Sequence, residues 1–198
     1  RARWDGRSLP LDDGFRARYR TLDGQGYGWD CTIAAGAAWF LDDGEGAERY
    51  TGTLRGHGVA TAPLHLVRVG LADGAVTMAE VCGRPGGLVA NPPLVDERRG
   101  VVVGFDSGNG VIAGFDLGTL DLRWRRDQDH GSHLLLFADG GELVCGDGAD
   151  VVVLDVATGE ERARADTGLG VQSVVFPAPG DGCAYVVAFT GVARIAPA

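Results

Sequence analysis

Four polar side chains recur near the start of successive apolar hairpins, and stacked hairpins would bring them together. They are Asp30, Asn91, His133 and Gln172, spaced about 40 to 60 residues apart. A carboxylate, two amides and an imidazole offer donors and acceptors to one small ligand. The alternative is that these groups cap strand ends or bond neighbouring sheets, because buried polar groups must be paired.

The same surface would collect neighbouring side chains and one long loop. The neighbours are Trp29, Ser132 and Ser173, each adjacent to one of the four polar positions. A glycine-rich stretch at 42–62 carries His57 among several charged residues. An insertion of this length is often a lid or a binding loop, and the alternative is a decoration without a binding role. His57 is therefore a loop candidate.

Other local motifs have structural interpretations. "DQDHGSH" at 127–133 suggests a metal site, but Gly131 indicates a turn and the spacing implies no shared face. "DSGNG" at 106–110 lacks the acidic ligands of a calcium loop and predicts a hairpin turn. A hydrolase has no support, because no Gly-x-Ser-x-Gly elbow is present.

Composition excludes several classes of function. The net charge of −9 opposes nucleic-acid binding, which depends on neutralising phosphates. All 18 basic residues are arginine, so lysine-dependent chemistry such as Schiff bases is excluded. No apolar run approaches the length of a membrane span. The chain starts at Arg1 without Met, and we expect it to be a piece of a longer product.

The four cysteines are widely spaced and form no CxxC motif. We expect small buried apolar side chains, since three of the four lie in or beside apolar runs. A disulfide between Cys31 and Cys82 is the alternative in an oxidising compartment.

The elements that would position the polar residues follow from an internal repeat. "VIAGFDLGTLDLRWR" at 111–125 and "VVVLDVATGEERAR" at 151–164 align with an offset of 39 residues, which places Asp155 over Asp116. Hairpins beginning near Gly28, Leu88, His130 and Gly170 precede a third and a fourth strand. In the clearest fourth strand, Leu120, Leu122 and Trp124 alternate with charged residues, so we expect one buried face.

This pattern predicts an all-β fold, a β-propeller of about four four-stranded antiparallel blades. Inner strands that are apolar on both faces suit sheets packed between neighbours, and a period near 40 is typical of propellers. Arginines repeat at period two on the outer strands, where we expect a solvated rim, with anion binding as the alternative. These arginines are Arg16, Arg18 and Arg20, then Arg123 and Arg125, then Arg162 and Arg164.

We expect one propeller domain over 1–198. The predicted blades are 24–83, 85–127, 130–167 and 170–198, the last completed by 1–20 if the ends meet. In that case Leu11 to Arg20 supplies the missing fourth strand and the ring closes. We favour the alternative, a segment of a larger propeller.

The phrase "VVVLDVATGEERAR", with its Asp-x-x-Thr-Gly turn, resembles the repeat of the quinoprotein (PQQ-like) propeller superfamily, with WD40 and YVTN propellers as close alternatives. The resemblance implies a periplasmic or extracellular setting. Some members are dehydrogenases that hold pyrroloquinoline quinone (PQQ) and calcium, and others are scaffolds for protein assembly. The enzymes most similar to this chain carry adjacent cysteines, which this chain lacks.

From the sequence we expect a binding or scaffold module that uses its axial face for a protein partner or a small molecule. Nucleic acid and a membrane span are not expected. The alternative is a quinoprotein oxidoreductase domain whose missing blades carry the cofactor residues. No catalytic residue and no metal ligand is assigned.

Overall fold

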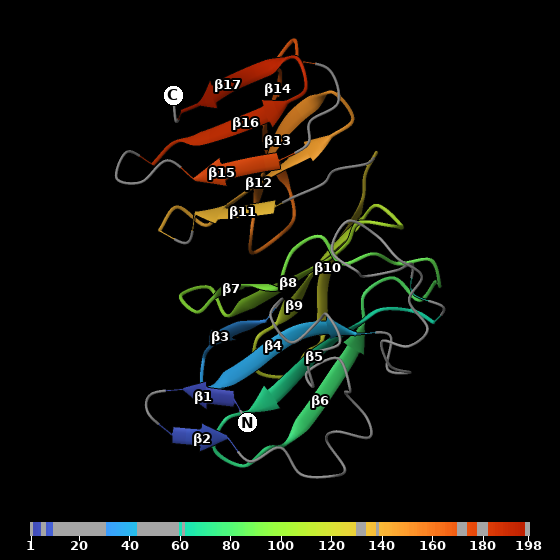
Figure 1. The fold of residues 1–198 in the computed structure, drawn as a ribbon, viewed down its shortest axis with the longest axis vertical. Helices are drawn as coiled ribbons and strands as arrows, with labels where there is room; N and C mark the ends of the chain where they lie inside the picture. The colour runs from blue at the N-terminus through green and yellow to red at the C-terminus, as the bar shows by residue number, and fades with distance from the viewer. Residues whose placement is uncertain are drawn as a thin grey trace.

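The computed structural model describes residues 2–4, 7–9, 31–42, 60, 62–129, 134–137, 139–169, 174–177 and 182–196. Every regular element in these ranges is a β-strand (Figure 1). This confirms the predicted all-β class. None of the described residues forms a helix that could span a membrane.

Strands that are consecutive in sequence pair antiparallel into four successive sheets. Sheet 1 contains β3 (Thr32–Ala34), β4 (Ala37–Asp42), β5 (His65–Gly70) and β6 (Val76–Glu80). Sheet 2 contains β7 (Leu94–Asp96), β8 (Val101–Asp106), β9 (Val111–Asp116) and β10 (Leu122–Asp127). Sheet 3 contains β11 (Leu134–Phe137), β12 (Glu142–Asp147), β13 (Asp150–Asp155) and β14 (Glu161–Asp166). The described part of sheet 4 contains β15 (Val174–Pro177), β16 (Ala184–Ala188) and β17 (Gly191–Ile195).

The predicted hairpins are confirmed, including the "DSGNG" turn that joins β8 to β9. Two short strands, β1 (Ala2–Trp4) and β2 (Arg7–Leu9), pair with each other in a separate sheet. The segment from Leu11 to Arg20, predicted as a fourth strand for sheet 4, lies outside the described residues. Completion of that sheet by the N-terminal region therefore stays a prediction.

The four sheets are arranged in sequence order, and their first strands, which we call the inner strands, contact one another. β3 contacts β7, β7 contacts β11 and β11 contacts β15, and these strands succeed one another from the bottom to the top of Figure 1. Sheets 1 and 4 lie at opposite ends of the long axis in that view. Inner strands that meet while outer strands diverge are the arrangement of propeller blades.

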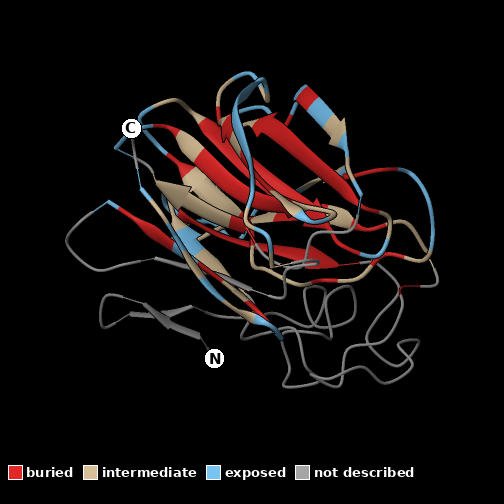
Figure 2. Cartoon of the chain, turned by 90° about the horizontal axis from the view of Figure 1, so that it is seen from above, coloured by how far each residue is buried: buried red, intermediate tan, exposed pale blue. Residues whose placement is uncertain are grey.

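Sheets 2 and 3 each lie between two other sheets. Successive side chains along their strands pack alternately against one neighbour and the other. On β8, Val102 packs toward sheet 1, whereas Val101, Val103 and Phe105 pack toward sheet 3. A strand buried on both faces has no polar face, which explains the run of apolar letters at 101–105. Sheets 3 and 4 share a smaller cluster that includes Val144 and Val186. Figure 2 shows these buried strands at the centre of the described fold.

One aromatic side chain locks sheet 2 to sheet 3. Trp124 of β10 is 8% exposed, and its indole Nε1–H donates to the carbonyl of Val156 at 2.9 Å. The ring lies against Gly114 of its own sheet and Gly159 of the next, where a Cβ on either glycine would collide with the indole. The joint therefore depends on one large residue and two absent side chains.

A carboxylate clip explains the repeat with offset 39. Asp116 Oδ1 accepts the backbone N–H groups of Gly118 at 2.8 Å and Thr119 at 2.9 Å, and Oδ2 accepts Arg123 at 2.6 Å. The turn between the third and fourth strands is thereby tied to the fourth strand. The same clip in sheet 3 uses Asp155 with Ala157, Thr158 and Arg162.

The predicted burial of one residue on the outer strand is wrong. Leu122 was expected on the same buried face as Leu120 and Trp124, but it is 56% exposed. The pairing of β10 with β9 shifts register between Leu122 and Trp124, so a β-bulge breaks the alternation at this point. Leu120 is buried and Trp124 is buried, as predicted.

The four cysteines, all within the described residues, are thiols with no disulfide between them. Cys82, Cys145 and Cys183 are buried and Cys31 is partly buried. This confirms the predicted burial of three of them, although their sulfur atoms also have polar partners in Asp106, Gln128 and Arg194. The alternative pairing of Cys31 with Cys82 does not form.

Candidate binding face and the contacts that fix it

Of the residues predicted to line the axial face, the described part of the chain includes one, Asn91. The others lie outside the described residues: Trp29, Asp30, His57, Ser132, His133, Gln172 and Ser173. Their participation in a site therefore stays a prediction. The strands that they precede or follow are described, and these strands form the framework of this face.

Hydrogen bonds connect neighbouring sheets where their first strands begin. We use the term lead-in segment for the residues just before a first strand together with the first residue of that strand. The Asn91 side chain accepts the Leu134 N–H at 3.0 Å and donates to the Leu134 carbonyl at 3.2 Å. The Thr32 hydroxyl donates to the carbonyl of Pro93. These bonds connect the lead-ins of sheets 1, 2 and 3 in sequence. The Asn91 amide thus makes the inter-sheet bonds that were the structural alternative for this residue.

In sheets 2 and 3 the lead-in segment is also held by the turn between the second and third strands of its own sheet. In sheet 2, Asp106 Oδ1 accepts the Leu88 N–H at 3.3 Å, and the Ser107 hydroxyl donates to the Leu88 carbonyl at 3.0 Å. In sheet 3, Asp147 Oδ1 accepts the Asp129 N–H at 2.7 Å. The two kinds of loop therefore form one connected face, which we call the axial face.

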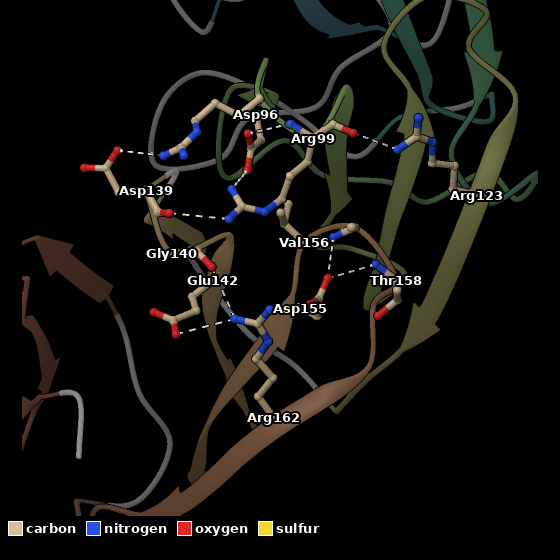
Figure 3. A network of polar contacts seen from close by, with 12 residues as sticks. Asp96, Arg99, Arg123, Asp139, Gly140, Glu142, Asp155, Val156, Thr158 and Arg162 are labelled. Atoms are coloured by element: carbon tan, nitrogen blue, oxygen red, sulfur yellow. Dashed lines mark hydrogen bonds and ion pairs between the residues drawn. The ribbon is translucent and has the colours of Figure 1, made fainter.

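The opposite face carries an arginine network between sheets 2 and 3 (Figure 3). Arg99 binds the buried Asp96 at 2.8 Å and reaches the Asp139 carbonyl of sheet 3 at 3.4 Å. Arg123 donates to the Arg99 carbonyl at 3.0 Å, and Arg162 donates to the Gly140 carbonyl at 3.3 Å. These guanidinium groups bond backbone carbonyls and carboxylates, as expected for a structural network.

The described arginines of the predicted rim all have carboxylate partners. Arg125 pairs with Asp127 at 3.1 Å, and Arg164 contacts Asp147, Asp150 and Glu161 within 3.0 Å. Paired cations at this rim favour a solvated structural surface over an anion site. Arg16, Arg18 and Arg20 lie outside the described residues.

One carboxyl group and three thiols of this framework have displaced pKa values. The pKa of Asp116 falls to about 2, first through the Thr119 N–H and then through the Arg123 guanidinium. Burial raises the pKa of the Cys145 thiol to about 12, and burial also raises the pKa values of Cys31 and Cys82. The carboxylate is held charged and the thiols are held neutral, which suits structural roles.

The family resemblance raises the question of a PQQ and calcium site. Within the described ranges, no three His, Cys, Asp or Glu side chains gather as metal ligands. Asp106 is occupied by Leu88, Asn109 and Cys82, and Asp147 by Asp129 and two arginines. The described residues do not fit a calcium–quinone site. The two histidines of "DQDHGSH" lie outside the described residues.

Sequence analysis missed a groove between sheets 3 and 4. Ala163 of β14 lines it, at the position where Trp124 stands in sheet 2. The alignment with offset 39 already placed alanine over tryptophan, and that loss of volume was the available signal.

Comparison with known proteins identifies the fold. No family model matches the chain, and no curated protein matches it in sequence. BamB from Moraxella catarrhalis is similar in structure, with a TM-score of 0.58 and 14% identity over 83% of this chain. The dihydro-heme d1 dehydrogenase NirN gives a TM-score of 0.53 and 17% identity over 71% of this chain. The computationally designed Ika4 protein gives a TM-score of 0.55 and 11% identity over 84% of this chain.

These similarities confirm the β-propeller fold, since BamB and NirN are propeller proteins. The matched region covers 41% of the BamB chain, 34% of the NirN chain and 89% of the Ika4 chain. This chain therefore spans less than half the length of the two natural proteins. At these identities the likeness concerns fold alone, and function must be argued from sites.

Proposed function

We propose that this chain is a binding module that holds a partner protein or a small molecule on its axial face. The observation that carries the proposal is the set of hydrogen bonds linking successive lead-in segments, above all those from Asn91 to Leu134. His133 directly precedes Leu134 in sequence, so these bonds anchor the backbone beside a candidate ligand-binding side chain. Asn91 serves as the anchor, and its neighbours along the other lead-ins serve as binding groups.

A hydrogen-bonded framework next to the assigned polar side chains favours a binding role. Loops held by a fixed scaffold can present recognition groups without a large ordering cost on binding. Asp106 and Asp147, at the turns between second and third strands, accept backbone N–H groups from the lead-in segments of sheets 2 and 3. We assign ligand contact to Trp29, Asp30, Ser132, His133, Gln172 and Ser173, with His57 as a loop contributor.

A capture experiment with the full chain tests this assignment. Three forms of the chain serve as bait: the wild type, the axial variant Asp30→Ala/His133→Ala, and a matched control on the opposite face, Arg98→Ala/Glu160→Ala. Both control residues are exposed, and the pair again removes one acidic and one basic group. A partner retained by wild type and control but lost from the axial variant supports the proposal. Equal retention by all three folded proteins contradicts it.

A titration separates binding from the quinoprotein alternative. Each protein is melted with and without PQQ and calcium chloride. A ligand that binds only the folded state at 100 times its dissociation constant stabilises it by about 2.7 kcal/mol. A shift of that kind in wild type, absent from Asp30→Ala/His133→Ala, would replace the scaffold assignment with the oxidoreductase.

A further inference from the structure

A groove lined by described residues lies between sheets 3 and 4, and the axial face does not use it. It has a volume of about 430 Å³. Its wall is largely apolar, with contributions from Phe137, Val144, Val151, Val153, Ala184 and Ile195. A cavity of this size and character is large enough for a small organic ligand.

The register of the strands shows why this space exists. In sheet 2, Trp124 of β10 stands opposite Gly114 of β9. In sheet 3, Ala163 of β14 stands opposite Val153 of β13, at the same place relative to the β-bulge. Both residues have changed, and at the position of the Trp124 ring the described part of sheet 3 carries only the methyl group of Ala163.

The hydrogen-bond acceptor of the filled joint also has a counterpart in the groove. Trp124 donates to the carbonyl of Val156, the residue directly after the third strand of sheet 3. Ala196 directly follows the third described strand of sheet 4, β17, and it lines the groove. The groove therefore has an apolar wall, and by this alignment Ala196 is the counterpart of the residue whose carbonyl accepts an indole N–H one joint earlier.

The charges at the groove mouth favour a neutral ligand. Arg162 pairs with Glu142 at 3.5 Å and also with Asp155. Arg164 is held by Asp147, Asp150 and Glu161. With both guanidinium groups neutralised by carboxylates, an anionic ligand gains little, and a planar ring gains contact with their flat faces.

We propose that this groove is a binding site for a small, neutral, planar heteroaromatic molecule of the indole class. Its ring takes the place that Trp124 occupies in the preceding joint, over Ala163 and Val153. Its N–H donates to the Ala196 carbonyl. This site is separate from the axial face, and it stands or falls independently of the proposed function.

Indole itself is the probe, titrated into the ¹⁵N-labelled full chain. We expect saturable shifts of the amide signals of Ala163, Ala165 and Ala184. Ala163→Trp supplies the chain's own indole, so it should weaken binding of added indole by about tenfold or more, because the site is already filled. Val192→Trp is the matched control, since Val192 is 62% exposed on β17 and does not line the groove, and this variant should bind as wild type does.

The melting temperature of Ala163→Trp gives a second measurement. A ring that enters the groove buries apolar surface, so Ala163→Trp should melt a few degrees above wild type and Val192→Trp should not. If Ala163→Trp fails to fold, Ala163→Leu blocks the same space with less bulk. Unchanged indole binding in a folded blocking variant would overturn the proposal, as would the absence of any shift at saturating indole.

Two further probes refine the chemistry. 1-Methylindole lacks the N–H donor and should bind several-fold more weakly; equal affinity would overturn the assigned bond to Ala196. N-acetyltryptophanamide represents a tryptophan side chain from a partner protein. Binding of free indole about tenfold tighter than this amide supports a small ligand, and the reverse order would overturn the small-ligand assignment.

Discussion

The indole of Trp124 is expected to make the largest single contribution to the joint between sheets 2 and 3. Trp124→Ala removes a side chain that is only 8% exposed and leaves a cavity between two backbones, a change that costs about 3–5 kcal/mol. With a urea dependence of about 2 kcal/mol per M, the unfolding midpoint should fall by about 2 M. Trp124→Phe keeps a ring but leaves the Val156 carbonyl unpaired, so it should cost about 1–3 kcal/mol.

Leu122→Ala is the matched control on the same strand. This side chain is 56% exposed, so its loss should change the unfolding free energy by less than about 0.5 kcal/mol. Urea unfolding followed by far-ultraviolet circular dichroism measures all three variants. If the urea midpoint of Trp124→Ala is as close to the wild-type value as that of Leu122→Ala, then Trp124 does not stabilise the joint between sheets 2 and 3.

A double-mutant cycle tests the contact between Trp124 and Gly159 directly. Gly159 has φ of +72°, and a Cβ there would lie 2.6 Å from the indole. Gly159→Ala should therefore carry both a backbone penalty and a clash in wild type, but only the backbone penalty when it is combined with Trp124→Ala. We expect a coupling of about 1–3 kcal/mol, and additive costs would contradict the assigned contact.

Acid, alkylating reagents and a side-chain deletion test other parts of the framework. Asp116→Asn should be less stable than wild type at pH 7: the folded pKa of Asp116, about 2, is below its unfolded value, so its contribution is complete above about pH 4 and lost as pH falls toward 2. Urea midpoints at pH 7, 4 and 2.5 should converge, and a constant gap would count against the clip. Cys145, with its pKa near 12, should resist iodoacetamide at pH 8 until the protein unfolds, whereas the partly buried Cys31 should react sooner. Mass spectrometry of timed samples measures the order in which the two thiols are alkylated. Early alkylation of Cys145 would argue against its burial. Asn91→Ala should lower the unfolding free energy by about 1–3 kcal/mol through the loss of two bonds to Leu134, and a neutral effect on the melt would remove the anchor.

The repeat could be predicted because its chemistry is local. Asp116 binds groups two, three and seven residues ahead, so the same letters at Asp155 rebuild the same clip. The exposure of Leu122 could not be predicted in this way. Alternation assumes unbroken pairing, and the bulge before Trp124 appears in the pairing register but not in the order of apolar letters.

The convergence of the lead-in segments was predictable, but the use of Asn91 was not. Stacked hairpins bring position 91 near position 134 whatever side chains they carry. Whether the amide faces a ligand or the next backbone depends on the hydrogen-bond needs of Leu134, whose N–H and carbonyl both bond this side chain. The sequence therefore predicts where a polar side chain lies more securely than it predicts which group that side chain bonds.

Differences between repeats carry information that the shared letters do not. Leu120 and Gly159 occupy equivalent turn positions with similar positive φ values, 63° and 72°, so the backbone alone does not require glycine there. Gly159 differs from Leu120 in lying directly against the indole of Trp124, where a Cβ would collide with the ring. Gly159 therefore accompanies an aromatic ring in the preceding sheet, and Gly114 accompanies the same ring within its own sheet. In sheet 3, Val153 stands in place of Gly114 and Ala163 stands in place of Trp124, and a groove is present beside them. A glycine and an aromatic residue that are both replaced between repeats therefore indicate a space that is available for binding.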